Sequence, residues 1–539
     1  PDEKVYNSSN SFPGQYAEVI SDRVDFGYHI VSVKFCPIEY IPLERKLYLC
    51  DFSFLLEYSV SGTLFRTSIP EKQSKRLSAL DRDYVQSIVD NADMLDSFMQ
   101  YTNKSLSPVE AVVPEYLIIT NENLKNTFQV LANWKTKKGV PTIIETVESI
   151  IEKYRGGDTQ EKIRNYLEDI KSIYGSLFVL LGGDTNVIPA RMKRTRQSGK
   201  NALYAVDYYY ACAGKGTWHV SGNDMFIDDF GSNAFELAFK LGRAPVESQT
   251  EAEVFVNKVI NYEKCIGIED DRYYNNSLVV DAFIDNGECD SYLVYNDAKD
   301  SLVCYYNKYK ENTTNNVKSW FIFDDYLGTG SSRCMYYNAW KKIICYEDKE
   351  TKKKYYDPVP GGTSLPGNEE LSSASFLAAL NNGGNSNYGY FHIVYHMDHS
   401  SPNGMGASSK MKNQSISKFD VDKLSNGNYN QIVMSGGCTP ADITKDCIAE
   451  HFLNNPNGGA VAFIGNTDIG WASEYSQYQR FCKELYKETP SLTDRYDLSY
   501  LHIKANTSYN PPVNEGNCSL HLLGDPEMQV WHFHSVLSL

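Results

Sequence analysis

The spacing of hydrophobic positions divides the chain into two regions with different periods. Up to about residue 105, apolar and polar positions alternate in short runs, most clearly at 28–34 and 48–60. A period of two is typical of antiparallel strands that have one face in water. The pattern predicts a small antiparallel β unit over residues 1–105. The polar stretch 71–108 predicts a linker or processing segment that runs to about residue 111.

From residue 112 onward, apolar runs of strand length alternate with amphipathic segments of helical period. Such alternation predicts a parallel sheet covered by helices. One set of elements closes near residue 262 and another begins at residue 276, which predicts two side-by-side α/β subdomains over 112–265 and 266–539. The predicted strands are 116–120, 141–145, 176–181, 276–283, 317–323, 390–395 and 432–438, and the predicted helices are 124–138, 160–174, 250–262, 298–309, 369–381 and 441–453.

Two reactive side chains follow two of these predicted strands. Cys438 ends one apolar run, and a second run leads directly into His396 and His399. Open α/β sheets carry their functional groups at the carboxyl ends of strands, so the thiol and an imidazole are expected at one edge. A thiol of ordinary pKa is only a few per cent thiolate at neutral pH and needs a base or a helix N-terminus beside it. The predicted helix 441–453 would supply that N-terminus. The alternative interpretation of Cys438 is a small, inert, buried hydrophobe.

The histidines His392, His396 and His399 have a second interpretation. At helical spacing they would share one face and could bind zinc. The aromatic and β-branched residues before them favour a strand instead, on which His392 and His396 lie on the face opposite His399. We therefore expect a base rather than a metal cluster, and chemistry that requires no cofactor.

Short motifs in a fixed order extend across residues 112–531. They include Trp134-Lys135, Leu181-Gly182-Gly183-Asp184, Gly242-Arg243-Ala244-Pro245, the segment 395–400, Gly437-Cys438, the segment 459–467 and Gly524-Asp525-Pro526. In order and spacing these motifs resemble the gingipain family of cysteine peptidases. The resemblance implies a caspase-like α/β fold, with parallel sheets and flanking helices in two side-by-side subdomains, preceded by a small antiparallel β domain.

The resemblance also implies roles for residues around the thiol. His399 lines up with the family's catalytic histidine and is the expected base, with His396 as the alternative. The backbone N–H groups of Ser400 and Cys438 would stabilise an oxyanion. Two positions depart from the family pattern: Ser400 stands where the family has Gly, and Gly437 stands where it has Ala.

Further site residues follow from the same resemblance. Asp285 is expected to orient the imidazole, with Asp281 as the alternative. Asp290 would lie at the base of a pocket for an Arg or Lys side chain of the substrate, and Trp471 would form a wall of that pocket. A solvated turn rich in Asp, Asn and Gly is the other interpretation of 285–290.

The resemblance implies a secreted cysteine endopeptidase that cleaves protein or peptide substrates after Arg or Lys through a Cys-His dyad and a thioester. The run 33–40 and the segment 43–58 resemble the end of the family's β-rich prodomain, which implies a zymogen. Two alternatives stay open. The chain could be a catalytically silent binding or surface protein, or a transpeptidase that passes the acyl group to an amine.

Composition limits the classes of partner and the cellular locations that fit this protein. The formal net charge of −16 argues against nucleic acid and against an anionic membrane surface, because both require basic protein surface. The sequence has no apolar run near the roughly 20 residues that span a bilayer. The chain begins at Pro1, which fits an export signal already removed and a secreted or cell-envelope location in a bacterium.

The cysteines and the acidic loops indicate the redox setting and candidate metal sites. The twelve cysteines contain no Cys-x-x-Cys pair, so a reducing or anaerobic setting fits better than a disulfide framework. The acidic segment 224–229 and the polar stretch 324–366 are candidates for structural Ca²⁺.

Overall fold

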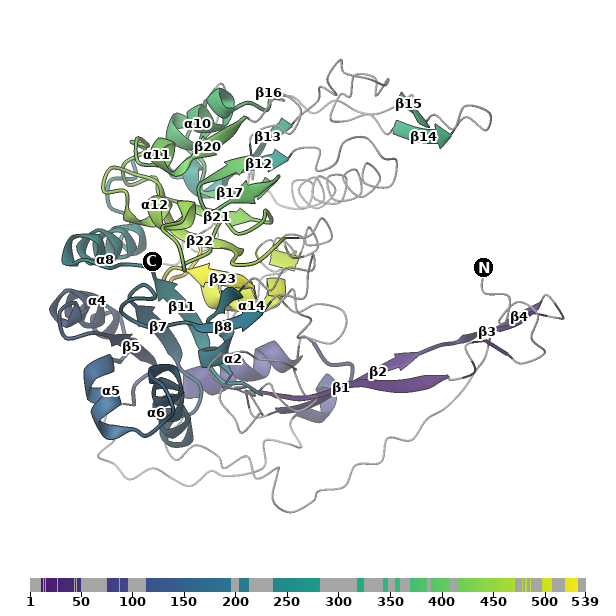
Figure 1. The fold of residues 1–539 in the computed structure, drawn as a ribbon, viewed down its shortest axis with the longest axis horizontal. Coiled ribbons are helices and arrows are strands. Elements are labelled where there is room, and N and C mark those ends of the chain that lie inside the picture. The colour runs from purple at the N-terminus through teal and green to yellow at the C-terminus, as the bar shows by residue number, and fades with distance from the viewer. Residues whose placement is uncertain are drawn as a thin grey trace.

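A computed structural model gives the arrangement of the chain, shown in Figure 1. The residues that it describes are 11–49 with short gaps, 75–95 except 87, 113–194, 203–212, 236–281, 318–323, 343–347, 354–358, 369–384, 389–406, 414–470, the positions 477, 480, 481 and 485, 497–506 and 519–531.

The centre of the fold is an 11-stranded sheet. Neighbouring strands are parallel except for β22 and β23, which pair antiparallel. In order across the sheet, the strands are β16 (Glu369–Glu370), β13 (Lys318–Phe323), β12 (Asn276–Asp281), β17 (Ile393–Met397), β21 (Gln431–Ser435), β22 (Ala460–Asn466), β23 (Leu520–Leu523), β11 (Lys240–Ala244), β7 (Phe178–Gly182), β5 (Tyr116–Thr120) and β6 (Thr142–Thr146).

The two predicted subdomains therefore share one continuous sheet. Strand β23 from the C-terminal segment pairs antiparallel with β22 and parallel with β11, so it joins the halves edge to edge. As a result, all strands of the first half run opposite to those of the second half. The prediction of an α/β fold with parallel strands is confirmed, and the joining strand is the feature that the prediction lacked.

Helices cover the sheet, and α4, α8 and α12 pack in a row along one side of it (Figure 1). No helix in the described part of the chain is long and apolar enough to cross a membrane. The helices beside the sheet are α4 (Lys125–Lys137), α5 (Val147–Lys153), α6 (Thr159–Tyr174), α7 (Tyr208–Ala211), α8 (Gln249–Glu263), α10 (Ser373–Asn382), α11 (Lys418–Val421), α12 (Ile448–Asn454) and α14 (Leu498–Asn506).

The central strands are apolar on both faces. In β12, Leu278 and Val280 pack into one hydrophobic cluster, while Val279 packs into another on the opposite face. Strand β17 repeats the division, with Val394 on one side and Ile393 on the other. Burial of both faces is why parallel strands appear in the sequence as continuous apolar runs.

Most predicted elements match the structure to within a few residues. The predicted helix 369–381 differs at its start, because β16 takes its first two residues and the Ser372 capping box begins α10 at Ser373. The predicted helix 298–309 lies outside the described residues. Smaller strand pairs are β8 (Arg191–Arg194) with β9 (Leu203–Val206), β14 (Ile343–Glu347) with β15 (Lys354–Pro358), and β18 (Ser400–Ser401), β19 (Gly404–Gly406) and β20 (Ser415–Ser417) in one sheet.

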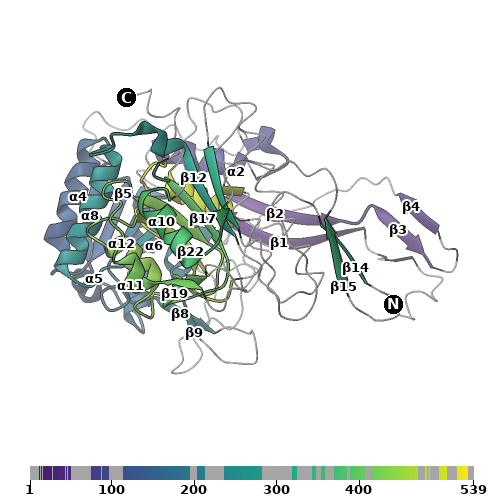
Figure 2. The ribbon, with the colours of Figure 1, turned by 90° about the horizontal axis from the view of Figure 1, so that it is seen from above.

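The N-terminal region contains antiparallel strands, and the predicted strand 28–34 is confirmed; most of the predicted strand 48–60 lies outside the described residues. β1 (Ala17–Asp25) and β2 (Tyr28–Phe35) form a long hairpin that projects away from the α/β body, with β3 (Ile38–Ile41) and β4 (Lys46–Leu49) beyond it (Figures 1 and 2). At its base, β1 pairs with β10 (Glu236–Leu237).

Part of the predicted linker 71–108 is instead a docked helix, α2 (Lys75–Gln86). Tyr84 and Val85 pack with Phe26 of the hairpin in one hydrophobic cluster. Asp81 pairs with Lys240, the first residue of β11, and both side chains are buried. The polar residues between these apolar positions gave the stretch the composition of a linker, although its buried side lies against the body.

A buried ionic cluster links the first half to the C-terminal strand. Lys135 of α4 is fully buried, and its Nζ lies 2.7 Å from carboxylate oxygens of Glu263 and Asp525 and 2.9 Å from Glu527. Lys138 adds contacts of 2.6 Å to Glu263 and Glu527. Burial favours the protonated form of Glu527, but the two lysines lower its pKa to about 2. The Trp134-Lys135 and Gly524-Asp525-Pro526 motifs thus share one structural role.

Replacing Lys135 by Met is expected to lower the free energy of unfolding by about 3–5 kcal/mol, because three buried carboxylates lose their common partner. Lys137→Met, on the exposed side of the same helix, is the matched control and should change stability by less than about 0.5 kcal/mol. Denaturant unfolding measures both. Equal, small effects in the two variants would contradict the structural role of the cluster.

Candidate active site

The predicted nucleophile and base follow two strands that are neighbours in the sheet. β17 and β21 pair in parallel, with His396 opposite Ser435. Parallel neighbours end at the same edge, so the loops that carry His399 and Cys438 leave the sheet side by side. His399 is exposed and Cys438 is partly exposed, so both side chains can be reached from solvent.

The two loops are in direct contact. A Cβ atom added to Gly437 would lie 2.0 Å from Oγ of Ser400 and 2.7 Å from the carbonyl oxygen of Asp398. The residue before the thiol therefore touches the residues on either side of His399. Because the Ser400 side chain fills this space, position 437 has room only for glycine. The two departures from the family pattern are thus one complementary pair, with the larger residue moved from one loop to the other.

The helix predicted directly after the thiol begins later than expected. α12 starts at Ile448, and residues 439–447 form an irregular loop in which the Asp442 carboxylate accepts hydrogen bonds from the N–H and hydroxyl groups of Thr444. Thr439 has a φ of 55°, which is rare for a β-branched residue and typical of functional sites. The prediction of a helix N-terminus at Cys438 is therefore wrong.

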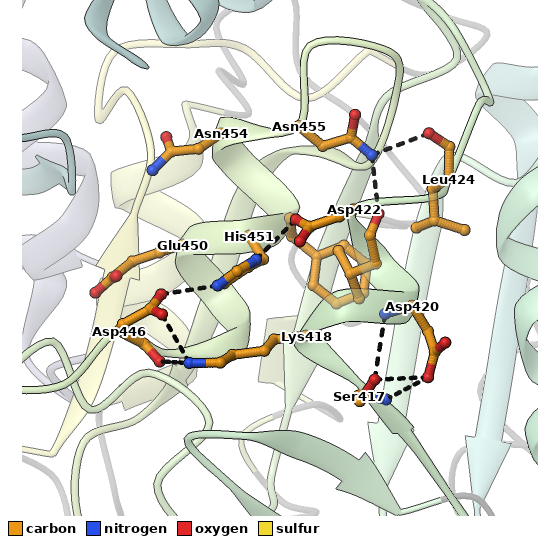
Figure 3. A network of polar contacts seen from close by, with 12 residues as sticks. Ser417, Lys418, Asp420, Asp422, Leu424, Asp446, Glu450, His451, Asn454 and Asn455 are labelled. Atoms are coloured by element: carbon orange, nitrogen blue, oxygen red, sulfur yellow. Dashed lines mark hydrogen bonds and ion pairs between the residues drawn. The ribbon is translucent and has the colours of Figure 1, made fainter. Parts of the chain in front are cut away.

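A network between α11 and α12 holds the far end of this loop, as Figure 3 shows. Asp446 contacts Lys418 and His451 at 2.7 Å each, and His451 also contacts Asp422 at 2.7 Å. Although partial burial favours the protonated form, hydrogen bonds from Lys418 and His451 lower the pKa of Asp446. The loop after the thiol is thus fixed at its end by charged side chains.

Residues at the end of β22 and just after it support the loop from its other side. Asn466 is fully buried; its Nδ2 donates to the Gly437 carbonyl (3.2 Å), and its carbonyl accepts from Ala441 N–H (3.1 Å). Asn466 therefore contacts the chain on both sides of the strained Thr439. Sγ of Cys438 lies 3.6 Å from the carbonyl oxygen of Gly470. Sequence reasoning missed these two residues; the available signal was a polar residue at the end of an apolar run.

The hairpin after His399 determines the direction of the Ser400 N–H. Gly406 N–H donates to the His399 carbonyl (2.7 Å), and Ser400 stands opposite Met405. Hydrogen-bonded and non-hydrogen-bonded pairs alternate in an antiparallel ladder, so Ser400 and Met405 form a non-hydrogen-bonded pair. The Ser400 N–H therefore points away from β19.

The other two histidines are buried. Both ring nitrogens of His396 lie 2.9 Å from protein partners, Ser435 Oγ and the Gly406 carbonyl, and burial lowers the pKa of His396 to about 4. His392 lies 2.7 Å from the Tyr262 hydroxyl. These contacts favour His399 over His396 as the base. Within the described residues, no three His, Cys, Asp or Glu side chains gather as metal ligands.

Most of the other predicted site residues cannot be placed. Asp285, Asp290 and Trp471 lie outside the described residues. Asp281 ends β12 opposite Met397 of β17, so its backbone lies at the same edge of the sheet as the candidate dyad. Among the described residues, no disulfide joins any two of Cys36, Cys212, Cys265, Cys438 and Cys447.

The contact between the two loops predicts a stability coupling. Gly437→Ala alone should lower the free energy of unfolding by about 1–3 kcal/mol, because its methyl group overlaps Ser400. In a Ser400→Gly background the same substitution should cost less, since only the overlap with the Asp398 carbonyl oxygen then remains. Denaturant unfolding of the two single variants and the double variant measures the coupling. An equal cost of Gly437→Ala in both backgrounds would contradict the contact.

Comparisons with known proteins bear on the family and the fold. The model of peptidase family C25 matches residues 110–531. The fold is similar to the crystal structure of the Arg-specific cysteine proteinase gingipain R (RgpB), with a TM-score of 0.50 and 17% identity over 79% of this chain and 80% of that chain. It is equally similar to the complex of the Porphyromonas gingivalis RgpB pro- and mature domains, with a TM-score of 0.50 and 17% identity over 77% and 79% of the two chains. No curated protein shows significant sequence similarity. Since the family model spans most of its length, the chain belongs to peptidase family C25, the gingipain family of cysteine peptidases.

Proposed function

We propose that the chain is an active cysteine endopeptidase with Cys438 as nucleophile and His399 as general base and acid. The observation that supports this most directly is the contact between Gly437 and Ser400, which joins the loops of the two residues at an open sheet edge. The exposure of both side chains to solvent fits a site for an extended peptide.

The reaction would begin when His399 removes the thiol proton of Cys438. The thiolate attacks the scissile carbonyl carbon and forms a tetrahedral oxyanion. When this intermediate collapses, the C–N bond breaks and His399 donates its proton to the leaving amine. A water molecule, deprotonated by His399, then attacks the thioester and releases the acid and the thiolate.

The oxyanion would be stabilised by the backbone N–H groups of Ser400 and Cys438. The ladder geometry directs the Ser400 N–H away from β19, which leaves it on the outer side of the hairpin. The strained turn at Thr439 and its supports from β22 would keep the Cys438 peptide in a single orientation before substrate binds.

Substrate preference is proposed from the resemblance. Asp290 would pair with an Arg or Lys side chain of the substrate, Trp471 would pack against its aliphatic stem, and Asp285 would orient His399. Asp281 remains the alternative to Asp285, and its place at the end of β12 fits that role.

We also propose that the chain is a zymogen. The strands of the two halves run in opposite directions, so the amino end of β11 lies at the same edge as the carboxyl ends of β17 and β21. Lys240 at that end pairs with Asp81 of α2, and this attachment at the edge of the proposed dyad supports a zymogen. The similar RgpB structure contains pro- and mature domains together. A cut within 71–108 would release the unit.

Export from a bacterial cell and a structural Ca²⁺ complete the proposal. Both follow from the family resemblance. The acidic segment 224–229 and most of 324–366 lie outside the described residues, so no described group holds the ion, and the chemistry above runs through the dyad alone.

Two other functions would give different outcomes. A silent binding protein would keep the fold without cleavage, and Ser400, in place of the family's glycine, favours that reading. A transpeptidase would form the same thioester but pass the acyl group to an added amine, which product analysis with amine nucleophiles detects.

Cleavage of a mixed peptide library, with and without Ca²⁺, tests the peptidase directly. Wild type should cleave after Arg or Lys, and Cys438→Ala and His399→Ala should each lose about three or more orders of magnitude in rate. His29→Ala, in β2 of the N-terminal hairpin, is a control for loss of a histidine outside the site. Cleavage after other residues would discard Asp290 but keep the dyad, and no cleavage after removal of the N-terminal unit would favour the silent protein.

Weakening the attachment of α2 should speed activation. Asp81→Asn keeps the size of the side chain but leaves Lys240 without its buried counter-charge. The N-terminal unit should then be released faster, with a shorter lag before activity, as followed by mass spectrometry and peptide hydrolysis. Asp83→Asn, exposed on the same helix, is the matched control. Equal lags before activity in the two variants would contradict a role of the Asp81–Lys240 ion pair in holding the N-terminal unit.

A further inference from the structure

His396 lies between the two loops that carry the proposed dyad. It belongs to β17, stands opposite Ser435 of β21 and is fully buried. Its ring stacks parallel to Phe376 with centroids 5.8 Å apart, so the ring cannot turn without displacing the core. The imidazole is therefore a rigid element at the carboxyl ends of two adjacent strands.

The hydrogen-bond partners determine which nitrogen carries the proton. The carbonyl oxygen of Gly406 only accepts, so Nε2 of His396 is the donor in that contact. Nδ1 is then an acceptor and receives the hydroxyl proton of Ser435. Oγ of Ser435 in turn accepts the N–H of Gly437 at 3.4 Å. The bonds thus form one directed chain from Gly437 to Gly406.

The two ends of this chain reach the two loops of the dyad. Gly437 directly precedes Cys438. Gly406 N–H donates to the carbonyl of His399 (2.7 Å), so Gly406 holds the backbone of the proposed base. The carbonyl of His396 itself accepts from Gly436 N–H (3.0 Å). A single buried imidazole therefore connects the backbone before the nucleophile with the backbone of the base.

The neutral state of the ring suits this role. Burial in an apolar environment lowers the pKa of His396 to about 4, so the imidazole is uncharged near neutral pH. A buried polar ring is tolerated when both nitrogens are hydrogen-bonded, as they are here. Removing either partner would break these hydrogen bonds. Of the possible substitutions, loss of the Ser435 hydroxyl breaks them with the smallest change in side-chain volume.

We propose that His396, acting with Ser435, is a positioning residue that sets the placement of Cys438 relative to His399. The role rests on the proposed peptidase function. It is separate from proton transfer, since His396 is buried and its two ring nitrogens are held by Ser435 and the Gly406 carbonyl. A displacement of the two loops by about 1 Å is enough to reduce the rate of such a reaction by about 10²-fold.

Ser435→Ala is the first test, because it removes one hydroxyl and no packing volume. Its kcat for a cleaved peptide should fall by about 10²-fold with KM nearly unchanged. The pH profile of Cys438 alkylation by iodoacetamide, followed by peptide mapping, should shift toward that of an ordinary thiol, because the proposed base His399 would no longer be held in place for the thiol. Ser499→Ala, which removes a buried hydroxyl in α14, should leave both readouts unchanged.

His396→Leu supplies the second test. Its apolar side chain removes both hydrogen bonds, the one to the Gly406 carbonyl and the one to Ser435. If the two residues act as one chain, the double variant with Ser435→Ala should lose no more kcat than the worse single variant. Additive losses, or an unchanged kcat and alkylation profile in Ser435→Ala, would overturn the positioning role.

The two readouts keep this inference apart from the proposed function. If wild type cleaves no peptide, the peptidase proposal fails, and the positioning role is decided by alkylation alone. A shifted alkylation profile in Ser435→Ala would then support it, and an unshifted one would overturn it.

Discussion

The parallel pairing of β17 with β21 is the constraint on which the candidate site depends. Their backbone register puts His396 opposite Ser435, and everything beyond that point follows from two chains leaving the sheet together. Both faces of these strands are buried, so a slip of one residue would exchange the side chains that pack into the two hydrophobic clusters. The packing of the whole sheet therefore maintains the register, and the register determines where the loops with Cys438 and His399 begin.

Three supports outside the pair hold the turn at Cys438. The Ser400 side chain fills the space over Gly437, Asn466 contacts both flanks of the turn, and the α11–α12 network fixes the loop end (Figure 3). Together these contacts maintain a left-handed Thr439, a conformation that costs of order 1–3 kcal/mol and persists only when its surroundings determine it. Such strain beside a thiol is consistent with a group held ready for reaction.

The sequence was sufficient where local pattern determines structure. Apolar runs that become β5, β7, β17 and β21 are buried on both faces, and amphipathic segments that become α4, α6 and α8 carry clear helical periods. The positions of Cys438 and His399 at strand ends could be predicted for the same reason. Prediction from the sequence failed where contacts between distant segments determine the structure. Nothing local to 520–523 indicates that β23 joins the halves, and the composition of 441–447 favours a helix that the turn at Thr439 prevents.

Charged groups buried in the core show the same limit. Lys135, Asp525 and Glu527 come from opposite ends of the chain, and their pairing is visible only after folding. The positioning chain through His396 is similar, since a histidine in an apolar strand has the same appearance in sequence whether it is a base or a buried link. Burial and the partners of both nitrogens separate the two roles.

The most direct test of the central claim is covalent labelling with a peptidyl acyloxymethyl ketone, with the site of modification mapped by mass spectrometry. The account predicts a single adduct on Cys438 after removal of the N-terminal unit, formed at least about 10³-fold more slowly in His399→Ala. Modification of a different cysteine, or an unchanged rate without His399, would contradict the dyad at the ends of β17 and β21.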